Sequence, residues 1–367
     1  MDGKDRVLRC IERRGIDRLP VRHEAEPPIN KSLMEHAGLS TEGLSNVWAS
    51  SRKSLYPLLE WLGDDFRYVE PEYVGPELRT YDDGSSEGLW GERYKMINYG
   101  PGEYSEAIVL PFAEVTDPAR LDDFRWPSPD WYDYSTIKSQ AEAVAQYAVV
   151  GGDAGFMDLI NGTARTRGVE QVLLDIATRD PVYLEIIDRR CEFFYEQARR
   201  ILEAAEGTID ILHMGDDWGS QNGPLISPAA YREIYMPRYR RINDLIHSFG
   251  ARSMVHICGS TRDLLPDIIE TGFDIYDVVQ VSAAGMGIEG LKRDFGDAIT
   301  FAGTLCVQTT LPHGTVEDVR REVALRQELF ADGGLILGPT HAIQAYTPIE
   351  NILEMYRAAG SLSPVQE

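Results

Sequence analysis

The sequence predicts an α/β protein built as a (β/α)8 TIM barrel. Eight short apolar runs are typical of strands, and a helical pattern separates each run from the next. Such alternation favours a parallel sheet, and eight repeats favour a sheet that closes on itself. A barrel of this kind exceeds 250 residues as one unit, so we expect a single domain over residues 1–367.

The chain opens with an N-terminal extension and the first two strands. Residues 4–14 predict a short helix, and the apolar run at residues 19–25 predicts the first strand. A helical region follows over residues 31–62. Residues 63–70 predict the second strand, because Pro71 ends the run.

Residues 72–133 depart from this rhythm. Aromatic residues alternate with glycine and proline, as in Trp90-Gly-Glu-Arg-Tyr and Trp126-Pro-Ser-Pro. This pattern predicts an insertion of short antiparallel strands and loops. We expect its aromatic side chains to serve packing, and the insertion itself to form either a lid or the surface of a homodimer.

After residue 135 helices and strands alternate regularly. The six further strands are expected at residues 147–152, 209–213, 253–257, 275–281, 299–303 and 335–337. Helices are expected at residues 135–146, 167–178, 181–205, 227–250, 261–270, 288–294 and 316–331, and from residue 347. Two of these helices have clear N-terminal signals. Asp180-Pro181 opens the helix at residues 181–205, and Thr315 with Asp318 opens the helix at residues 316–331.

The charge balance excludes several partners. The chain carries 36 basic and 59 acidic residues, a formal charge of -23, which repels nucleic acid and anionic membrane surfaces. No run approaches the length of a membrane span, and the four cysteines lack disulfide-like spacing. These features predict a cytoplasmic protein with a small-molecule substrate and neither a nucleic acid nor a membrane partner.

The run at residues 251–260 predicts a metal site. Alternation along a strand places His256 and Cys258 on the same face. Imidazole and thiolate suit Zn²⁺, and a catalytic zinc site has three protein ligands and one open position. The third ligand is His341 or Cys306; we favour His341, which lies among polar neighbours. The alternative is a packed histidine beside an inert buried thiol.

Further polar residues fall at the expected carboxyl ends of strands, where barrel enzymes place their active sites. Arg22, Asp153 and Asp216 are the candidate catalytic residues. Asp153, Asp216 or Glu70 could supply a fourth, displaceable ligand or a general base. An aspartate that braces a loop or caps a helix is the alternative for Asp216 and its neighbour Asp217.

Three motifs resemble the uroporphyrinogen decarboxylase superfamily, whose members include cobalamin-dependent methyltransferases that act on thiols such as coenzyme M. The motifs are His256-Ile-Cys-Gly-Ser, Gly215-Asp-Asp-Trp-Gly-Ser-Gln and Pro339-Thr-His-Ala-Ile-Gln. The resemblance covers most of the chain from Asp17 onward and implies a barrel with its cleft at the strand ends. Within these motifs, Asp217, Trp218 and Gln344 are the candidate cofactor-binding residues.

The resemblance is closer to the methyltransferase branch than to the decarboxylase. The decarboxylase has an arginine-rich N-terminal segment; here Arg22 matches one arginine, but Glu24 and Glu26 would repel a substrate with many carboxylates. In the methyltransferases the H-x-C pair binds zinc with a cysteine of a Pro-Gly-Cys-Gly loop, and His341 stands in that loop here.

The resemblance therefore implies a zinc-dependent methyltransferase. It would move a methyl group between a corrinoid and a thiol or similar small acceptor. The chain lacks the Asp-x-His-x-x-Gly run that binds cobalamin, so a partner protein would carry the corrinoid. One alternative is a metal-free decarboxylase of a porphyrinogen or smaller acid, with Arg22 holding a carboxylate and Asp216 or Asp153 stabilising a protonated intermediate. Another is a binding protein that kept the barrel without catalysis.

Overall fold

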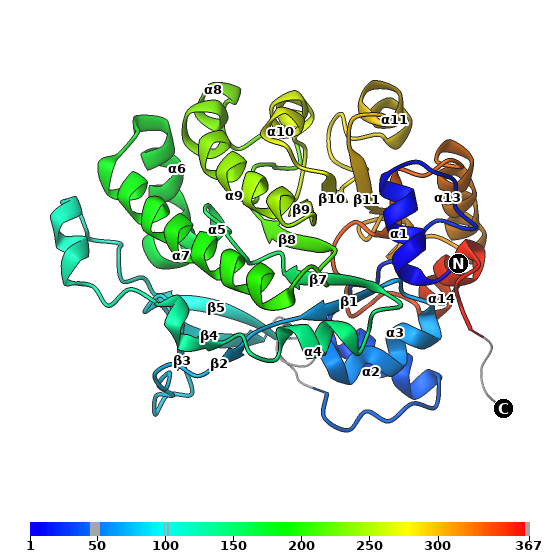
Figure 1. Cartoon of the computed structure of the whole chain (residues 1–367), viewed down its shortest axis with the longest axis horizontal. Helices are drawn as coiled ribbons and strands as arrows, with labels where there is room; N and C mark the ends of the chain where they lie inside the picture. Colours follow the sequence, from blue (N-terminus) through cyan, green and yellow to red (C-terminus); the bar gives the residue numbers. More distant parts are fainter. Residues whose placement is uncertain (45–51, 99, 101–102, 364–367) are drawn as a thin grey trace.

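The computed structural model describes residues 1–44, 52–98, 100 and 103–363, and its centre is a parallel sheet (Figure 1). Within these residues the sheet has seven strands in the order β1-β7-β8-β9-β10-β11-β12. They are β1 (Phe66–Val69), β7 (Ala148–Gly152), β8 (Ile211–Gly215), β9 (Arg252–His256), β10 (Ile275–Val279), β11 (Thr300–Leu305) and β12 (Leu335–Pro339). Each strand pairs with the next along the chain, as expected for a TIM-barrel-like α/β fold.

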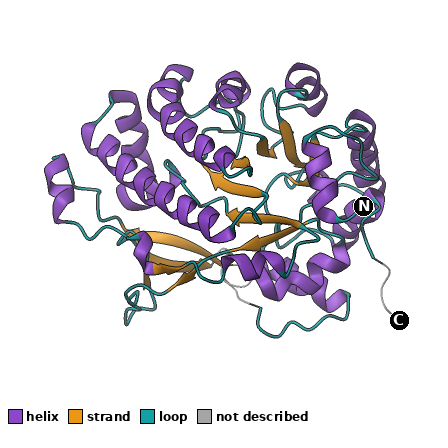
Figure 2. Ribbon diagram, in the orientation of Figure 1, coloured by secondary structure: helices purple, strands orange, loops and turns teal. Residues whose placement is uncertain are grey.

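Helices lie around this sheet (Figure 2), and every residue of β8, β10, β11 and β12 is buried. In the second half of the chain they include α7 (Pro181–Ala205), α9 (Met236–Ser248), α10 (Leu265–Thr271), α11 (Ile288–Phe295), α13 (Val316–Leu329) and α14 (Ile349–Ala359). The remaining helices are α1 (Gly3–Ile11), α2 (Pro27–His36), α3 (Tyr56–Leu62), α4 (Ile137–Glu142), α5 (Asn161–Arg167), α6 (Val169–Thr178), α8 (Pro228–Ala230) and α12 (Thr310–His313). No helix of the described residues is long and apolar enough to cross a membrane.

Two predicted helix starts are confirmed. The Asp180 carboxylate accepts a hydrogen bond from the Val182 amide, and Pro181 occupies the first turn of α7. Thr315 and Asp318 form a reciprocal capping box at the start of α13. Both caps satisfy amide groups that a helix leaves unpaired at its N-terminus.

The predicted strand at residues 19–25 is wrong as a regular strand. This segment takes the eighth place of the barrel but forms only isolated parallel bridges, Val21 to Leu337 and Ala25 to Ile343. On its other side the Val21 amide donates to the Asp65 carboxylate (2.8 Å) and the Asp65 amide donates to the Val21 carbonyl (3.0 Å). Pro20 has no amide hydrogen, and an aspartate side chain replaces a backbone acceptor, so a continuous ladder cannot form.

The predicted helical region at residues 31–62 is also interrupted. The structure has α2, a 3₁₀ turn (Arg52–Leu55) and α3, with α3 ending at Gly63 in a left-handed conformation. Residues 45–51 of this prediction lie outside the described residues.

The antiparallel insertion is confirmed. β2 (Glu72–Tyr73) pairs with β6 (Tyr132–Asp133), and β3 (Ser86–Glu87), β4 (Arg93–Asn98) and β5 (Glu103–Val109) form a three-stranded antiparallel sheet. Its aromatic residues pack onto α7: the rings of Trp90 and Phe193 lie 5.1 Å apart in an edge-to-face arrangement. Packing therefore explains this aromatic density, while the lid, the homodimer and the single-domain organisation stay predictions.

Candidate metal centre

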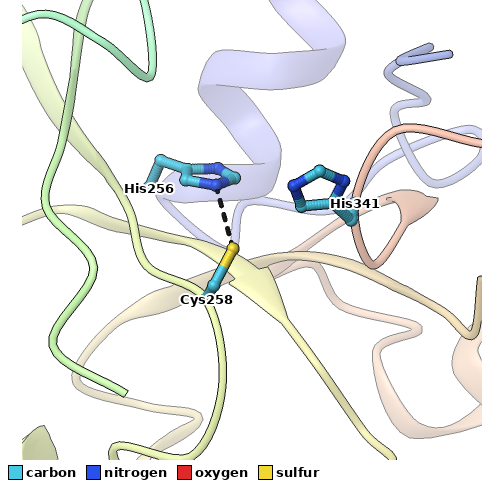
Figure 3. Close-up of side chains that lie close together, drawn as sticks. All are labelled: His256, Cys258 and His341. Atoms are coloured by element: carbon cyan, nitrogen blue, oxygen red, sulfur yellow. Dashed lines mark hydrogen bonds between the residues drawn. The ribbon is translucent and has the colours of Figure 1, made fainter. Parts of the chain in front are cut away.

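The structure brings the three favoured ligands together at the carboxyl ends of the strands (Figure 3). His256 is the last residue of β9, Cys258 follows it by two residues, and His341 follows β12 by two residues. Their ligand atoms all lie within 4.8 Å of one another, and Cys258 Sγ is 3.4 Å from His256 Nε2. Tetrahedral zinc with usual bond lengths separates such a sulfur and nitrogen by about 3.6 Å. The donor set therefore fits zinc.

Asp277 orients the first of these ligands. The register of β9 against β10 sets Asp277 beside His256, and Asp277 Oδ2 lies 3.0 Å from His256 Nδ1. With the proton on Nδ1, the Nε2 lone pair is free to face the metal position. Burial disfavours the charged carboxylate, but Arg22 and two histidines hold the pKa of Asp277 well below its usual value.

The two histidines favour protons when no metal is bound. Burial opposes their charge, yet Cys258 and Asp277 raise the pKa of His256 well above its ordinary value. Cys258 and Glu24 likewise raise the pKa of His341. Since ligands must lose protons to bind a metal, a metal would bind more weakly here as the pH decreases.

Arg22 is joined to His256 through Asp277 and has three protein partners. Its Nη2 donates to Asp277 Oδ1 (2.6 Å) and to Glu24 Oε2 (3.0 Å), and its Nη1 donates to the Tyr68 hydroxyl (3.1 Å). The side chain is only 5% exposed. It therefore does not present a free cation to a substrate carboxylate.

His213 on β8 is a further buried polar residue beside Asp277 and His256. Its Nε2 lies 3.4 Å from Asp277 Oδ2, too long for a good hydrogen bond, and neither ring nitrogen has a hydrogen-bond partner. His213, His256 and Asp277 form a second set of ligand atoms within reach of one another. Arg22 already occupies this carboxylate, which makes the set with Cys258 the better metal site.

Of the two predicted aspartates after β8, the Asp217 carboxylate holds the loop of Cys258 in place. Asp217 Oδ1 accepts from the Cys258 amide (2.7 Å), and Asp217 Oδ2 accepts from the Asn161 side chain (2.6 Å). Asp216 is 1% exposed and accepts from the Ile160 amide (2.8 Å) and from Trp218 Nε1 (3.0 Å). Burial, then nearby Asp158, raises the pKa of Asp216 well above its usual value.

Other predicted residues have partners outside the ligand group. Trp218 is fully buried, with Tyr231 and Tyr239 edge-on to its ring. Asp153 accepts from the Gly155 amide (2.7 Å), and Gln344 donates to the Ala342 carbonyl (2.9 Å). Cys306 is 2% exposed and belongs to neither set of potential ligands found in the described part of the chain.

Sequence reasoning missed Asp277, although a signal was present. It is an acidic residue in the apolar run Ile275-Tyr-Asp-Val-Val279, where every residue is buried. A charged side chain inside a buried strand requires a charged or hydrogen-bonding partner. That requirement identifies a functional candidate even before its partners are known.

Comparison with known proteins identifies the family of the chain. A profile described as uroporphyrinogen decarboxylase (URO-D) matches residues 135–362, more than half of the sequence. The chain belongs to the URO-D family. The matched part of this URO-D protein contains Asp153, the H-x-C pair and His341, whereas Arg22 and Glu24 lie outside it.

Two curated relatives of this URO-D protein are methyltransferases. It is 31% identical over 157 residues to a methylated-thiol–coenzyme M methyltransferase of Methanosarcina mazei, covering 43% of this chain and 39% of the relative. It is 26% identical over 178 residues to methylcobamide:CoM methyltransferase MtaA of Methanosarcina barkeri, covering 48% of each chain. The matches thus span less than half the length of these relatives.

A solved structure confirms the fold. A methyltransferase from Methanosarcina mazei superposes with a TM-score of 0.67 at 18% identity and covers 98% of both chains. The similarity extends over the N-terminal segment and the insertion as well as the barrel.

Proposed function

We propose that this URO-D family chain is a zinc-dependent methyltransferase that moves a methyl group between a corrinoid on a partner protein and a thiol or similar small acceptor. The observation that carries the proposal is the convergence of His256, Cys258 and His341 at the barrel mouth. Support comes from the relatives, whose names describe methyl transfer to coenzyme M.

Each residue of the centre has a distinct part in this proposal. His256, Cys258 and His341 would hold the ion, which lowers the pKa of a bound thiol when it is present. Asp277 fixes the tautomer of His256, and Asp217 fixes the backbone of Cys258. In the transfer the acceptor sulfur would bond to the methyl carbon as the carbon–corrinoid bond breaks; the electron pair of that bond would stay on the corrinoid, and the thiol proton would pass to solvent.

The decarboxylase alternative has less support. It requires Arg22 to hold a substrate carboxylate, but this guanidinium already donates hydrogen bonds to three protein side chains. It also requires a reactive aspartate, and the Asp216 carboxylate already accepts hydrogen bonds from a buried amide and an indole. Asp153 and Gln344 keep their proposed catalytic and cofactor-binding roles as predictions.

The proposal is tested with free methylcobalamin in place of the partner-carried corrinoid. Zinc-loaded protein should accelerate demethylation of methylcobalamin by 2-mercaptoethanol, followed by the change in corrinoid absorbance. Cys258→Ala should reduce the rate about 100-fold or more, since it removes a ligand. The matched control Cys306→Ala should retain the rate. Equal rates in Cys258→Ala and wild type would reject the proposed function.

A further inference from the structure

The connections that follow five strands of the barrel are unusually poor in charge. Charged residues make up 26% of the chain, and Asp216 and Asp217 directly follow β8. Beyond this pair, no Asp, Glu, Lys or Arg occurs in the connections after β8 to β12, which are residues 218–227, 257–261, 280–287, 306–315 and 340–348. We call these residues the uncharged rim.

The opposite end of the barrel has no such depletion. The connections that lead into β8, β10, β11 and β12 each hold an aspartate, namely Asp210, Asp274, Asp297 and Asp332. The same strands therefore have charged residues at one end and uncharged residues at the other. The absence of charge from the rim is a property of the barrel mouth and not of the second half of the chain as a whole.

Hydrogen bonds join the rim into one surface. Gln221 Nε2 donates to the Ser282 carbonyl (2.8 Å), and the Ser282 hydroxyl donates to Gln308 Oε1 (2.7 Å). The Thr340 hydroxyl accepts from the Val307 amide (3.1 Å). These contacts hold the connections after β8, β10, β11 and β12 side by side.

Two of the proposed metal ligands belong to this surface. Cys258 lies in the connection after β9, and His341 lies in the connection after β12. The Gly259 amide donates to Gln280 Oε1 (2.7 Å), which fixes the connection of Cys258 against the one after β10. A molecule that covers the rim would therefore lie next to the proposed metal ligands.

The rim offers neutral hydrogen-bonding groups and an aromatic ring. Gln221 and Gln308 are exposed, and each uses one atom of its side-chain amide within the rim. Gln221 Oε1 and Gln308 Nε2 have no hydrogen-bond partner among the described residues. The Tyr346 ring is exposed and stacks on His313 with the ring centroids 6.2 Å apart. This surface suits a ligand with neutral donors, neutral acceptors and apolar groups.

We infer that the uncharged rim receives the corrinoid and recognises the carboxamides at the edge of the corrin ring. Acetamide and propionamide side chains of such a ring match the free amide atoms of Gln221 and Gln308. An ionised side chain covered by the ring would lose its hydration without gaining a counter-charge, which is a physical reason for the absence of charge here. The inference rests on the proposed function and specifies how its corrinoid is recognised.

Free cyanocobalamin tests this surface, because it has the ring amides but no methyl group to transfer. Its dissociation constant is measured by equilibrium dialysis against the zinc-loaded protein. Gln308→Glu and Gln308→Lys should both weaken binding about tenfold or more, since each places a charge against a neutral partner. The matched controls Gln146→Glu and Gln146→Lys should bind as the wild type does, because this exposed glutamine precedes β7 at the opposite end of the barrel.

A second measurement varies the ligand instead of the protein. The wild type should bind cyanocobalamin about tenfold or more tightly than a derivative whose propionamides are hydrolysed to carboxylates, since the rim has no cation to pair with them. Salt at about 0.15 M screens the remote charges of the chain in this comparison. If a Gln308 variant does not fold, the comparison of these two corrinoids decides.

The outcomes separate the two proposals. No measurable binding of cyanocobalamin to the wild type, equal binding in the Gln308 and Gln146 variants, or tighter binding in either Gln308 variant overturns the inference. The methyltransferase proposal then stands if methylcobalamin is still demethylated. Gln308 variants that bind cyanocobalamin normally but change from dimer to monomer in sedimentation would identify an interface between copies, which also overturns the inference. A wild type that binds cyanocobalamin through the rim but transfers no methyl group rejects the proposed function alone.

Discussion

At the residue scale, Asp277 connects the buried charges to the metal ligands. Its two carboxylate oxygens have different partners: Oδ1 accepts a hydrogen bond from Arg22, and Oδ2 is hydrogen-bonded to His256 Nδ1. The arginine keeps the carboxylate charged inside the barrel, and the charged carboxylate in turn keeps His256 in the tautomer that a metal requires.

Asp277→Asn should therefore weaken zinc binding about 10- to 100-fold, measured by competition with a chromophoric chelator. Asp274→Asn is the matched control. Asp274 also pairs with a histidine, His247, at 2.8 Å, but it precedes β10 and so lies at the opposite end of the strand from the metal ligands. Equal zinc affinities in the two variants would show that Asp277 does not support the centre.

The sequence predicts the candidate metal ligands but not the residues that orient them. The alternation of a strand predicts that His256 and Cys258 share a face, which is a local property of three residues. The contact of Arg22 with Asp277 joins positions 255 residues apart. Only the folded barrel sets the N-terminal segment of Arg22 against β10, and no local pattern predicts that contact.

At the element scale, the segment that closes the barrel depends on a carboxylate. Asp65 accepts from Arg6 (2.5 Å), Arg18 (2.8 Å) and the Val21 amide (2.8 Å), and it is 2% exposed. This network substitutes for the hydrogen bonds of a regular eighth strand. It explains why a strand was predicted at the right place and yet with the wrong conformation.

Asp65→Ala should lower the free energy of unfolding by about 3–5 kcal/mol, because it removes the buried carboxylate that two arginines and a buried amide share. The measurement is urea-induced unfolding. Asp17→Ala, which also removes a carboxylate from Arg6 (2.7 Å) but at a side chain 42% exposed, should cost about 1 kcal/mol or less. Similar losses in both variants would contradict the role of Asp65 in barrel closure.

Elements with strong local signals were predicted well. The helices α7 and α13 begin at capping residues, and the strands of the second half read as short apolar runs between helices. The prediction of one helical region at residues 31–62 failed because periodicity alone does not show that α2 ends at His36 and that α3 begins only at Tyr56. Long-range contacts of Asp65, rather than local propensity, explain the departure at residues 19–25.

At the scale of the whole molecule, a URO-D family barrel brings together side chains from both ends of the chain. His256 ends β9, and Cys258 and His341 follow β9 and β12. Arg22 and Glu24 belong to the N-terminal segment that bridges to β12. We propose that this site binds zinc through His256, Cys258 and His341.

The most direct test is the metal content of protein purified without chelator or tag-derived metal, determined by elemental analysis. We expect about one zinc ion per chain in the wild type and in Cys306→Ala, and little zinc in His341→Ala. A wild type that contains no zinc even after zinc is offered would contradict the claim. Zinc retained in His341→Ala but lost in Cys306→Ala would equally contradict it, because the third ligand would then be Cys306.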